Sequence, residues 1–257
     1  MTVWLFTIDV PLYLPQAIDS ILDAHSERIE KIVLAPPSSD LMIRQQYRMF
    51  GPVDSLRMGR LYAQGAALGL LSPAHQRRLT GRLHSVRAAA KAHDVPVETV
   101  SDISDPNFVD RVRSAAPELL LSLVCAQRLG SELLDVPEWA INLHPSLLPK
   151  YRGAAPEFWA LYHDEAETGW TAHVMVEAFD AGPIIEQRTL PIRDEETLHS
   201  LTQRLSDVVS DFAIDLVDAF PDADFDTRPN PSTDEHYCPM PSVEQRKTFK
   251  RRGNRFL

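Results

Sequence analysis

Cysteines are scarce in this 257-residue chain. It has two, Cys125 and Cys238, and neither has a CxxC partner or a metal-ligand spacing. The pattern gives no sign of a disulfide framework, and a reducing compartment fits it best. No apolar run reaches the roughly 18 residues that a membrane span needs. The N-terminal stretch lacks a basic leader and carries Asp9, so it predicts a first strand and not a signal peptide. These absences favour a cytoplasmic protein without a membrane partner.

Positive charge is also scarce outside the C-terminus. The net charge is −10, yet the last twelve residues, RKTFKRRGNRFL, hold six Lys or Arg and no acid, which leaves about −16 on residues 1–245. Such an acidic body argues against a general nucleic-acid binder, because phosphate backbones attract basic surfaces. The basic tail could still hold one anionic group. With 44% hydrophobic and 24% charged residues, the chain is typical of a packed globular protein.

Short apolar runs alternate with helical patterns along the chain. VWLFTI (3–8) and KIVLAP (31–36) enclose an amphipathic helical pattern at 13–26, and ELLLSLV (118–124) has the continuous apolar character of a central parallel strand. This order predicts an α/β fold with a doubly wound, mostly parallel sheet, a Rossmann variant. Further strands are expected at 95–100, 138–144, 170–177 and 182–192, the last two antiparallel because their connection is short.

Helices are predicted from their start and stop signals. Residues 40–71 favour short helices of no assignable role, and Ser72-Pro73 begins a helix that runs to about His93. Asp105-Pro106 and Pro156 begin two more, and Asp194 is expected to cap the last long helix, which ends near Phe220. Residues 1–220 therefore form one domain, and residues 221–257 form a Pro- and Asp-rich linker with an irregular basic tail.

The stretch INLHPSLLPKYRGAAP (141–156) carries the strongest chemical signal. Strand periodicity places Asn142 and His144 on one side of the sheet, at the carboxyl end of a parallel strand, where ligands bind in such sheets. An amide and an imidazolium can both donate to an oxyanion as a carbonyl becomes tetrahedral. A carboxylate that assists proton transfer would complete the set. The best candidate is Asp180, in a turn before Ala181-Gly182.

With these residues in place, the sequence resembles the folate-dependent formyltransferases, which include methionyl-tRNA formyltransferase, glycinamide ribonucleotide transformylase and the sugar N-formyltransferases. The agreement covers roughly 50 positions in order and spacing. The matching residues are Asn142-Leu143-His144-Pro145-Ser146-Leu147-Leu148-Pro149, Arg152-Gly153, Gly169-Trp170-Thr171-Ala172-His173 and Asp180-Ala181-Gly182-Pro183-Ile184-Ile185.

The resemblance implies a one-carbon transferase that uses 10-formyltetrahydrofolate as co-substrate and no metal, with Asn142, His144 and Asp180 as catalytic residues. The acceptor amine attacks the formyl carbon on N10 of the folate. His144, as imidazolium, and Asn142 hold the oxyanion, while Asp180 keeps His144 charged and helps to move a proton to N10. A metal site made of His144, His173 and Asp180 is disfavoured because no HxH or HExxH spacing appears.

The resemblance also implies binding residues. The pterin is expected between the loop that follows residue 124 and the loop before Asp180, with contacts from Arg128, Leu129, Ala178 and Asp180. Pro145, Ser146 and Arg152 are expected beside the acceptor, where Arg152 either holds an acceptor phosphate or pairs with a surface acid. His173 is interpreted as a buried hydrogen-bonded support.

Where the sequence departs from familiar members of this family, the choice of acceptor narrows. The first strand is followed by FTIDVPLYLP, without the Gly-rich phosphate loop of glycinamide ribonucleotide transformylase. Only about 37 residues follow the last predicted helix, too few for the C-terminal barrel of methionyl-tRNA formyltransferase. By elimination we expect a small amine, such as an amino sugar on a nucleotide. A methionyl-tRNA formyltransferase-like protein without the barrel, a formyltetrahydrofolate hydrolase and a non-catalytic folate-binding protein stay open, as does the oligomeric state, a homodimer included.

Overall fold

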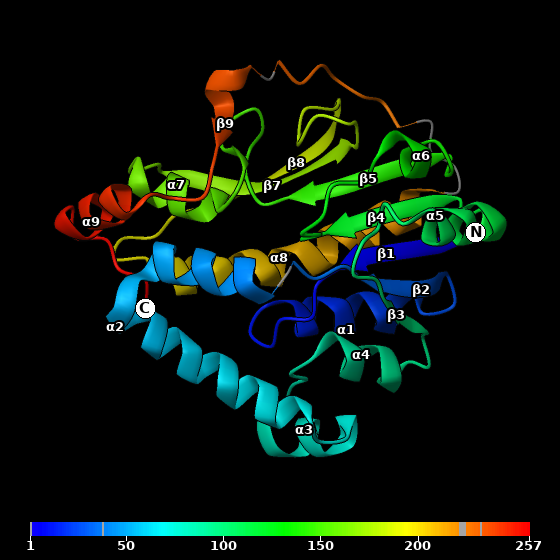
Figure 1. The fold of residues 1–257 in the computed structure, drawn as a ribbon, viewed down its shortest axis with the longest axis horizontal. Helices are drawn as coiled ribbons and strands as arrows, with labels where there is room; N and C mark the ends of the chain where they lie inside the picture. The colour runs from blue at the N-terminus through cyan, green and yellow to red at the C-terminus, as the bar shows by residue number, and fades with distance from the viewer. Residues whose placement is uncertain (1, 38, 221–224, 232) are drawn as a thin grey trace.

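A single twisted sheet organises the structure (Figure 1). The computed structural model describes residues 2–37, 39–220, 225–231 and 233–257. Within them, seven strands form one sheet whose order is β3 (Val97–Thr99), β2 (Ile29–Leu34), β1 (Val3–Thr7), β4 (Leu119–Leu123), β5 (Trp139–His144), β7 (Glu167–Val174) and β8 (Ile184–Pro191). The first five are parallel, and β7 runs antiparallel to both of its neighbours, β5 and β8. The predicted doubly wound, mostly parallel sheet is confirmed.

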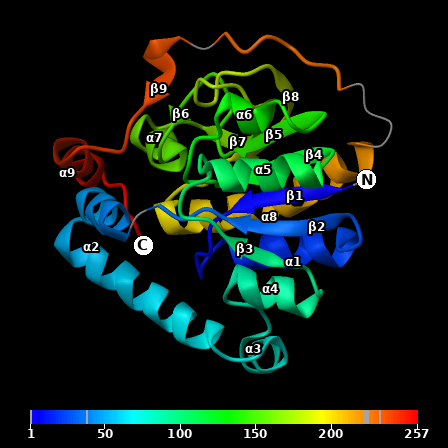
Figure 2. The same ribbon diagram turned by 45° about the vertical axis from the view of Figure 1, so that its right-hand side comes forward.

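Helices cover both faces of this sheet (Figure 2), because successive strand residues point to opposite sides. Val3 and Leu5 face one core, with α1 (Leu14–His25), α4 (Val86–Ala92) and α8 (Leu198–Ala219). Trp4 and Phe6 face the other core, with α5 (Pro106–Ala115) and α6 (Ser131–Leu134). No described helix is long and apolar enough to cross a membrane.

Residues 40–71 form longer helices than the sequence predicted. Helix α2 (Ser39–Gly69) is broken only at Gly51, whose φ of 71° and ψ of 178° are not helical, and Pro52 follows in the sequence. Proline removes an N–H donor and its ring clashes with the preceding turn. The result is a long, kinked arm that runs away from the sheet to α3 (Pro73–Thr80) (Figure 1).

Two predicted helix boundaries are wrong. The helix expected from Ser72 to about His93 is divided into α3 and α4: Gly81 ends α3 with a left-handed φ of 75°, and the Ser85 side chain accepts a hydrogen bond from the Ala88 N–H to begin α4. Helix α8 is capped by Thr197 and not by Asp194. Thr197 forms a reciprocal capping box with Ser200.

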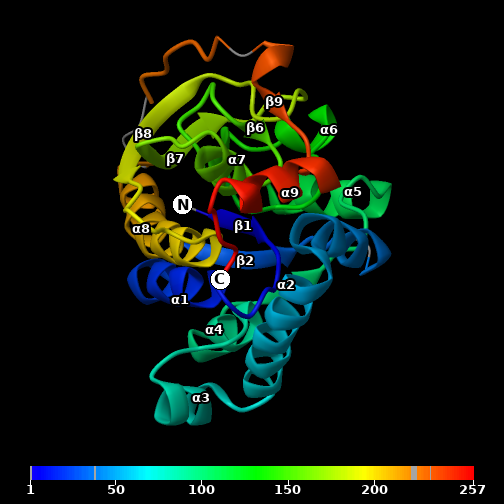
Figure 3. The ribbon, with the colours of Figure 1, turned by 90° about the vertical axis from the view of Figure 1, so that its left-hand side faces the viewer.

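The C-terminal segment packs on the domain despite its basic charge. It contains β9 (Tyr237–Cys238), which pairs with β6 (Arg152–Gly153), and α9 (Val243–Arg251), which lies beside the first half of α2 (Figure 3). Phe249 is fully buried, with its ring centroid 4.7 Å from that of Phe158. Arg246 donates to the carbonyl oxygens of Tyr47 and Arg48. The basic residues therefore reach outward while the aromatic side chains join the core.

Candidate active site

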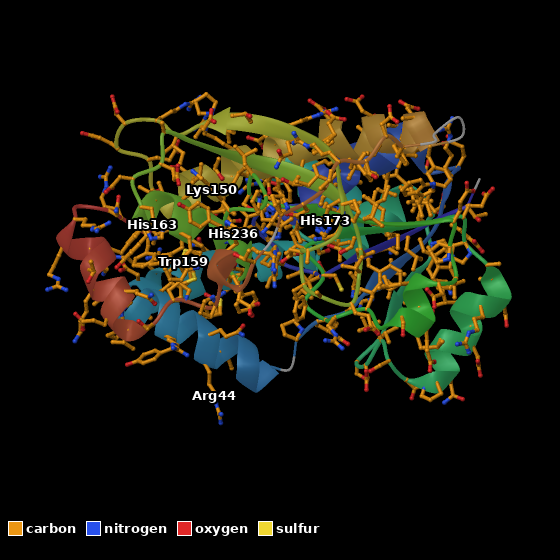
Figure 4. The ribbon with its side chains drawn as sticks, turned by 90° about the horizontal axis from the view of Figure 1, so that it is seen from above. Arg44, Lys150, Trp159, His163, His173 and His236 are labelled. Atoms are coloured by element: carbon orange, nitrogen blue, oxygen red, sulfur yellow. The ribbon has the colours of Figure 1, made fainter. Side chains whose placement is uncertain are left out.

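The polar centre of the sheet lies where β5 and β7 pair. Asn142 is opposite His173, and His144 is opposite Thr171. Asp180 lies in the loop between β7 and β8 with a left-handed φ of 49°, a conformation that aspartate tolerates better than most residues. The structure thus brings together Asn142, His144 and Asp180, with His173 as a fourth member. Figure 4 shows His173 in the interior of the fold.

A short chain of hydrogen bonds orients this group. The His173 Nδ1–H donates to the Val174 carbonyl oxygen at 2.9 Å, so in the neutral ring Nε2 is an acceptor. The Asn142 Nδ2 lies 3.1 Å from that Nε2 and 3.3 Å from the Asp180 Oδ1. Its two hydrogens therefore point at His173 and at Asp180. The opposite amide orientation would set the Asn142 oxygen against a carboxylate.

His144 is held with one nitrogen facing Asp180. Its Nε2–H donates to the Tyr151 carbonyl oxygen at 3.1 Å, and its Nδ1 lies 3.5 Å from the Asp180 Oδ1. Burial lowers the pKa of His144, and Asp180 opposes this effect without outweighing it. The resemblance implied an imidazolium, whereas this shift favours the neutral ring, in which the Nε2–H bond to Tyr151 leaves Nδ1 without a proton.

Asp180 is ionised at every physiological pH. Burial alone would raise the pKa of its carboxyl, but His144, His173 and the Gly153 N–H, which donates to Oδ2 at 3.0 Å, together lower that pKa to about 2. A carboxylate beside His144 Nδ1 stabilises any proton that arrives there. The pair can therefore take up one proton and release it again.

Two clefts meet at this centre and share Cys125, Asn142, Phe179 and Asp180 as walls. The first, which we call the helix-side cleft, has a volume of about 460 Å³ and lies between the end of β5, the start of α7 (Pro156–Tyr162) and the C-terminal segment. The other residues of its wall include His144, Pro145, Gly153, Glu157, Tyr237 and Met240. Its size is within the range of small-molecule sites.

The second, which we call the loop-side cleft, lies between the loop after β4 and the β7–β8 loop. Arg128 and Leu129 line it together with Leu134 and Met175. Its volume is about 70 Å³, well below the roughly 300 Å³ at which ligand pockets begin. Phe179, which lines both clefts, is 49% exposed. Ala178 is exposed and does not line this cleft.

The predicted acceptor residues differ in their placement. Pro145 lines the helix-side cleft. Ser146 lines neither cleft: it is fully buried, and its hydroxyl donates to the Lys150 carbonyl oxygen at 2.7 Å within the turn. Arg152 also lines neither cleft: it lies on β6 with its guanidinium 5.7 Å from the centre of the Tyr237 ring, and its buried Nε has no hydrogen-bond partner among the described residues.

Several wall residues were not among the predicted site residues, namely Glu157, Phe179, Tyr237 and Met240. Phe179 belongs to the loop before Asp180 that was expected beside the pterin, and Glu157 directly follows Pro156. The other two lie in the C-terminal segment, where no local pattern marks them. Across the described part of the chain, no group of three or more His, Cys, Asp or Glu is placed to hold a metal ion.

The sequence of the chain is similar to that of a known protein family. Over residues 73–217, more than half of the chain, the sequence matches the family described as formyl transferase. The chain belongs to this family.

Proteins named methionyl-tRNA formyltransferase resemble the chain over different extents. It is 43% identical over 122 residues, 47% of its length, to methionyl-tRNA formyltransferase of Geobacter sulfurreducens, of which it covers 38%. The chain spans between 38% and 62% of the length of four such relatives.

Two solved structures share the fold at low identity. Glycinamide ribonucleotide transformylase 1 from Symbiobacterium toebii is 16% identical with a TM-score of 0.60, over 89% of this chain and 94% of that one. WlaRD, a sugar 3N-formyl transferase in the presence of dTDP and 5-N-formyl-THF, is 15% identical with a TM-score of 0.58, over 93% and 69%.

In this member of the formyl transferase family, Gly182 allows the Asp180 loop to lie against β7. A Cβ added at Gly182 would stand 1.9 Å from the Val174 carbonyl oxygen, so Gly182→Ala is expected to cost about 1–3 kcal/mol of unfolding free energy. Gly59→Ala is the control, since a Cβ there meets nothing within 4 Å and is expected to be neutral or stabilising by about 0.4–1 kcal/mol. Urea unfolding of both variants is the measurement, and equal midpoints would contradict a close approach at Gly182.

Proposed function

We propose that this protein transfers the formyl group of 10-formyltetrahydrofolate to a primary amine bound in the helix-side cleft. The observation that carries the proposal is the position of Asn142, His144 and Asp180 at the junction of two clefts. A transfer reaction needs both substrates to reach one point. Asn142 and Asp180 border both clefts, so a formyl group delivered from one side meets an amine from the other.

The proposed chemistry follows from the protonation states. The amine nitrogen attacks the formyl carbon, and the Asn142 Nδ2–H exchanges its bond to Asp180 for one to the developing oxyanion. Neutral His144 takes a proton from the attacking nitrogen on Nδ1, where the ionised Asp180 stabilises it. The same proton passes to N10 of the folate as the carbon–nitrogen bond breaks. The products are the formamide and tetrahydrofolate.

For the folate we propose the loop-side cleft. Leu129, Leu134 and Met175 offer apolar walls to a flat ring, and Asn142 and Asp180 stand at its inner end. Of the expected contacts, Arg128 and Leu129 line this cleft. Ala178 would contribute through its backbone once the loop has moved to admit the ring.

A small acceptor, such as an amino sugar on a nucleotide, is the first candidate amine. The volume of the helix-side cleft suits it. WlaRD, which shares the fold, is described with dTDP. The second candidate is methionyl-tRNA, because the curated relatives with 32–43% identity are methionyl-tRNA formyltransferases.

The test is an acceptor panel with 10-formyltetrahydrofolate, in which tetrahydrofolate production is followed. A dTDP-linked 3-amino sugar and methionyl-tRNA are the two probes, and a reaction without amine is the blank. Production that depends on either probe supports formyl transfer and names the acceptor class. Equal production in the blank would mean hydrolysis, and none with any probe would contradict the proposal.

A further inference from the structure

A carboxyl group outside the catalytic trio faces the same cleft. Glu157 is the second residue of α7, and it lines the helix-side cleft together with Asn142 and His144. It takes no part in the hydrogen bonds that join Asn142, His173, His144 and Asp180. The cleft therefore contains a second acid beside the catalytic residues Asn142, His144 and Asp180.

The surroundings of Glu157 disfavour its charge. No described Lys, Arg or His forms an ion pair with it, although its own backbone N–H donates to the carboxyl group. Burial raises the pKa of Glu157 to about 7. Tyr13 interacts electrostatically with Glu157, and its hydroxyl lies 2.7 Å from His199 Nδ1 and also interacts with Tyr62. The titratable groups that line the cleft together with Glu157 include His144, Asp180 and Tyr237.

The chemistry of the cleft requires a base of this kind. A primary amine arrives mostly as an ammonium ion and must lose one proton before it can attack. Asp180, with a pKa of about 2, is too weak a base, and the single free position on His144 is needed for the second proton. A group whose pKa lies near the working pH makes the best proton acceptor.

We propose that Glu157 binds the ammonium group of the acceptor and accepts its first proton. This inference rests on the proposed formyl transfer. The ammonium group gives its first proton to the Glu157 carboxylate, which later releases that proton to water. The resulting neutral amine then attacks the formyl carbon. The second proton travels through His144 to N10 of the folate.

The experiment compares Glu157→Gln with a matched control, Glu244→Gln. Glu244 is also the second residue of its helix, α9, but its side chain is 69% exposed. With whichever probe amine the wild type formylates, E157Q is expected to lose about 10²-fold or more in kcat/KM at pH 7. It should also lose the ascending limb of the pH profile with a midpoint near pH 7, whereas E244Q keeps both. Glu157→Asp should restore part of the rate.

A second readout does not depend on turnover. Because the folded-state pKa of Glu157 is raised above its ordinary value of 4.5, the wild type loses stability as pH rises from 4.5 through about 7, and glutamine does not. The melting temperature of E157Q minus that of the wild type should therefore become more positive as pH rises from about 5 to about 8.

The outcomes separate two failures. Unchanged kcat/KM and pH profile in E157Q would overturn the role of Glu157 while formyl transfer stands, and so would a melting difference that is constant with pH. A wild type that formylates no probe would overturn formyl transfer itself, and the inference with it. Loss of rate with unchanged folate binding in E157Q supports both.

Discussion

Replacing Asp180 by asparagine is expected to lower the kcat of formyl transfer by about 10²–10⁴-fold. The carboxylate carries a charge at any working pH, since its pKa is lowered to about 2. Asparagine keeps the shape and tolerates the left-handed backbone at this position, but it cannot stabilise the proton that His144 receives. Tetrahydrofolate production at saturating substrates is the measurement, with His144→Ala expected to fall in the same range.

Asp164→Asn is the matched control, because Asp164 also has a left-handed φ, of 54°, but is 70% exposed. It should leave kcat unchanged. The pH dependence of stability provides a second test of the Asp180 charge. The contribution of Asp180 is present above its ordinary pKa of 3.8 and is lost as pH falls through about 2. D180N should therefore be less stable than the wild type at pH 7 and match it near pH 2. Near-normal kcat in D180N would refute this role.

Truncating Phe249 to alanine should cost about 3–5 kcal/mol of unfolding free energy. The ring is fully buried, and its centroid lies 4.7 Å from that of Phe158 and 4.9 Å from that of Phe256. Loss of this contact leaves a cavity between α9 and α7. Denaturant unfolding monitored by circular dichroism is the measurement.

Val243→Ala in the same helix is the control, since Val243 is 44% exposed, and it should change stability by no more than about 0.5 kcal/mol. F249A should also weaken formyl transfer in conditions where the protein stays folded, because Tyr237 and Met240 of the same segment line the helix-side cleft. A loss below about 1 kcal/mol in F249A would mean that the tail contributes little to the core.

The sheet was predictable from the sequence because its strands are short, continuous apolar runs. Leu119–Leu123 is fully buried along its length, and such a run has few alternatives to a central strand. The position of Asn142 and His144 followed from the same logic, since the end of a parallel strand has a fixed place in the fold. The family resemblance implied that Asp180 acts with them. In the structure, the Asp180 Oδ1 lies 3.3 Å from the Asn142 Nδ2 and 3.5 Å from the His144 Nδ1.

The rest depended on contacts that local pattern does not encode. The basic tail looks solvated in sequence, yet Phe249 and Phe256 pack on residues about a hundred or more positions earlier. Glu157 looks like an ordinary first-turn acid, and only its burial by distant segments alters its pKa. The lone glycine at 81 ended a helix that the apolar and charged pattern alone would have continued.

The wall that the two clefts share bears on the order in which the substrates would bind and react. Asn142 and Asp180 belong to both, so under the proposed function they would border both substrates at once. The thiol that borders both clefts is Cys125, and burial raises its pKa, which leaves it a poor nucleophile for a formylated enzyme. Under the proposed formyl transfer, turnover is therefore expected to pass through a ternary complex, by a sequential and not a ping-pong route. The formyl group would leave the folate only after the acceptor amine has bound.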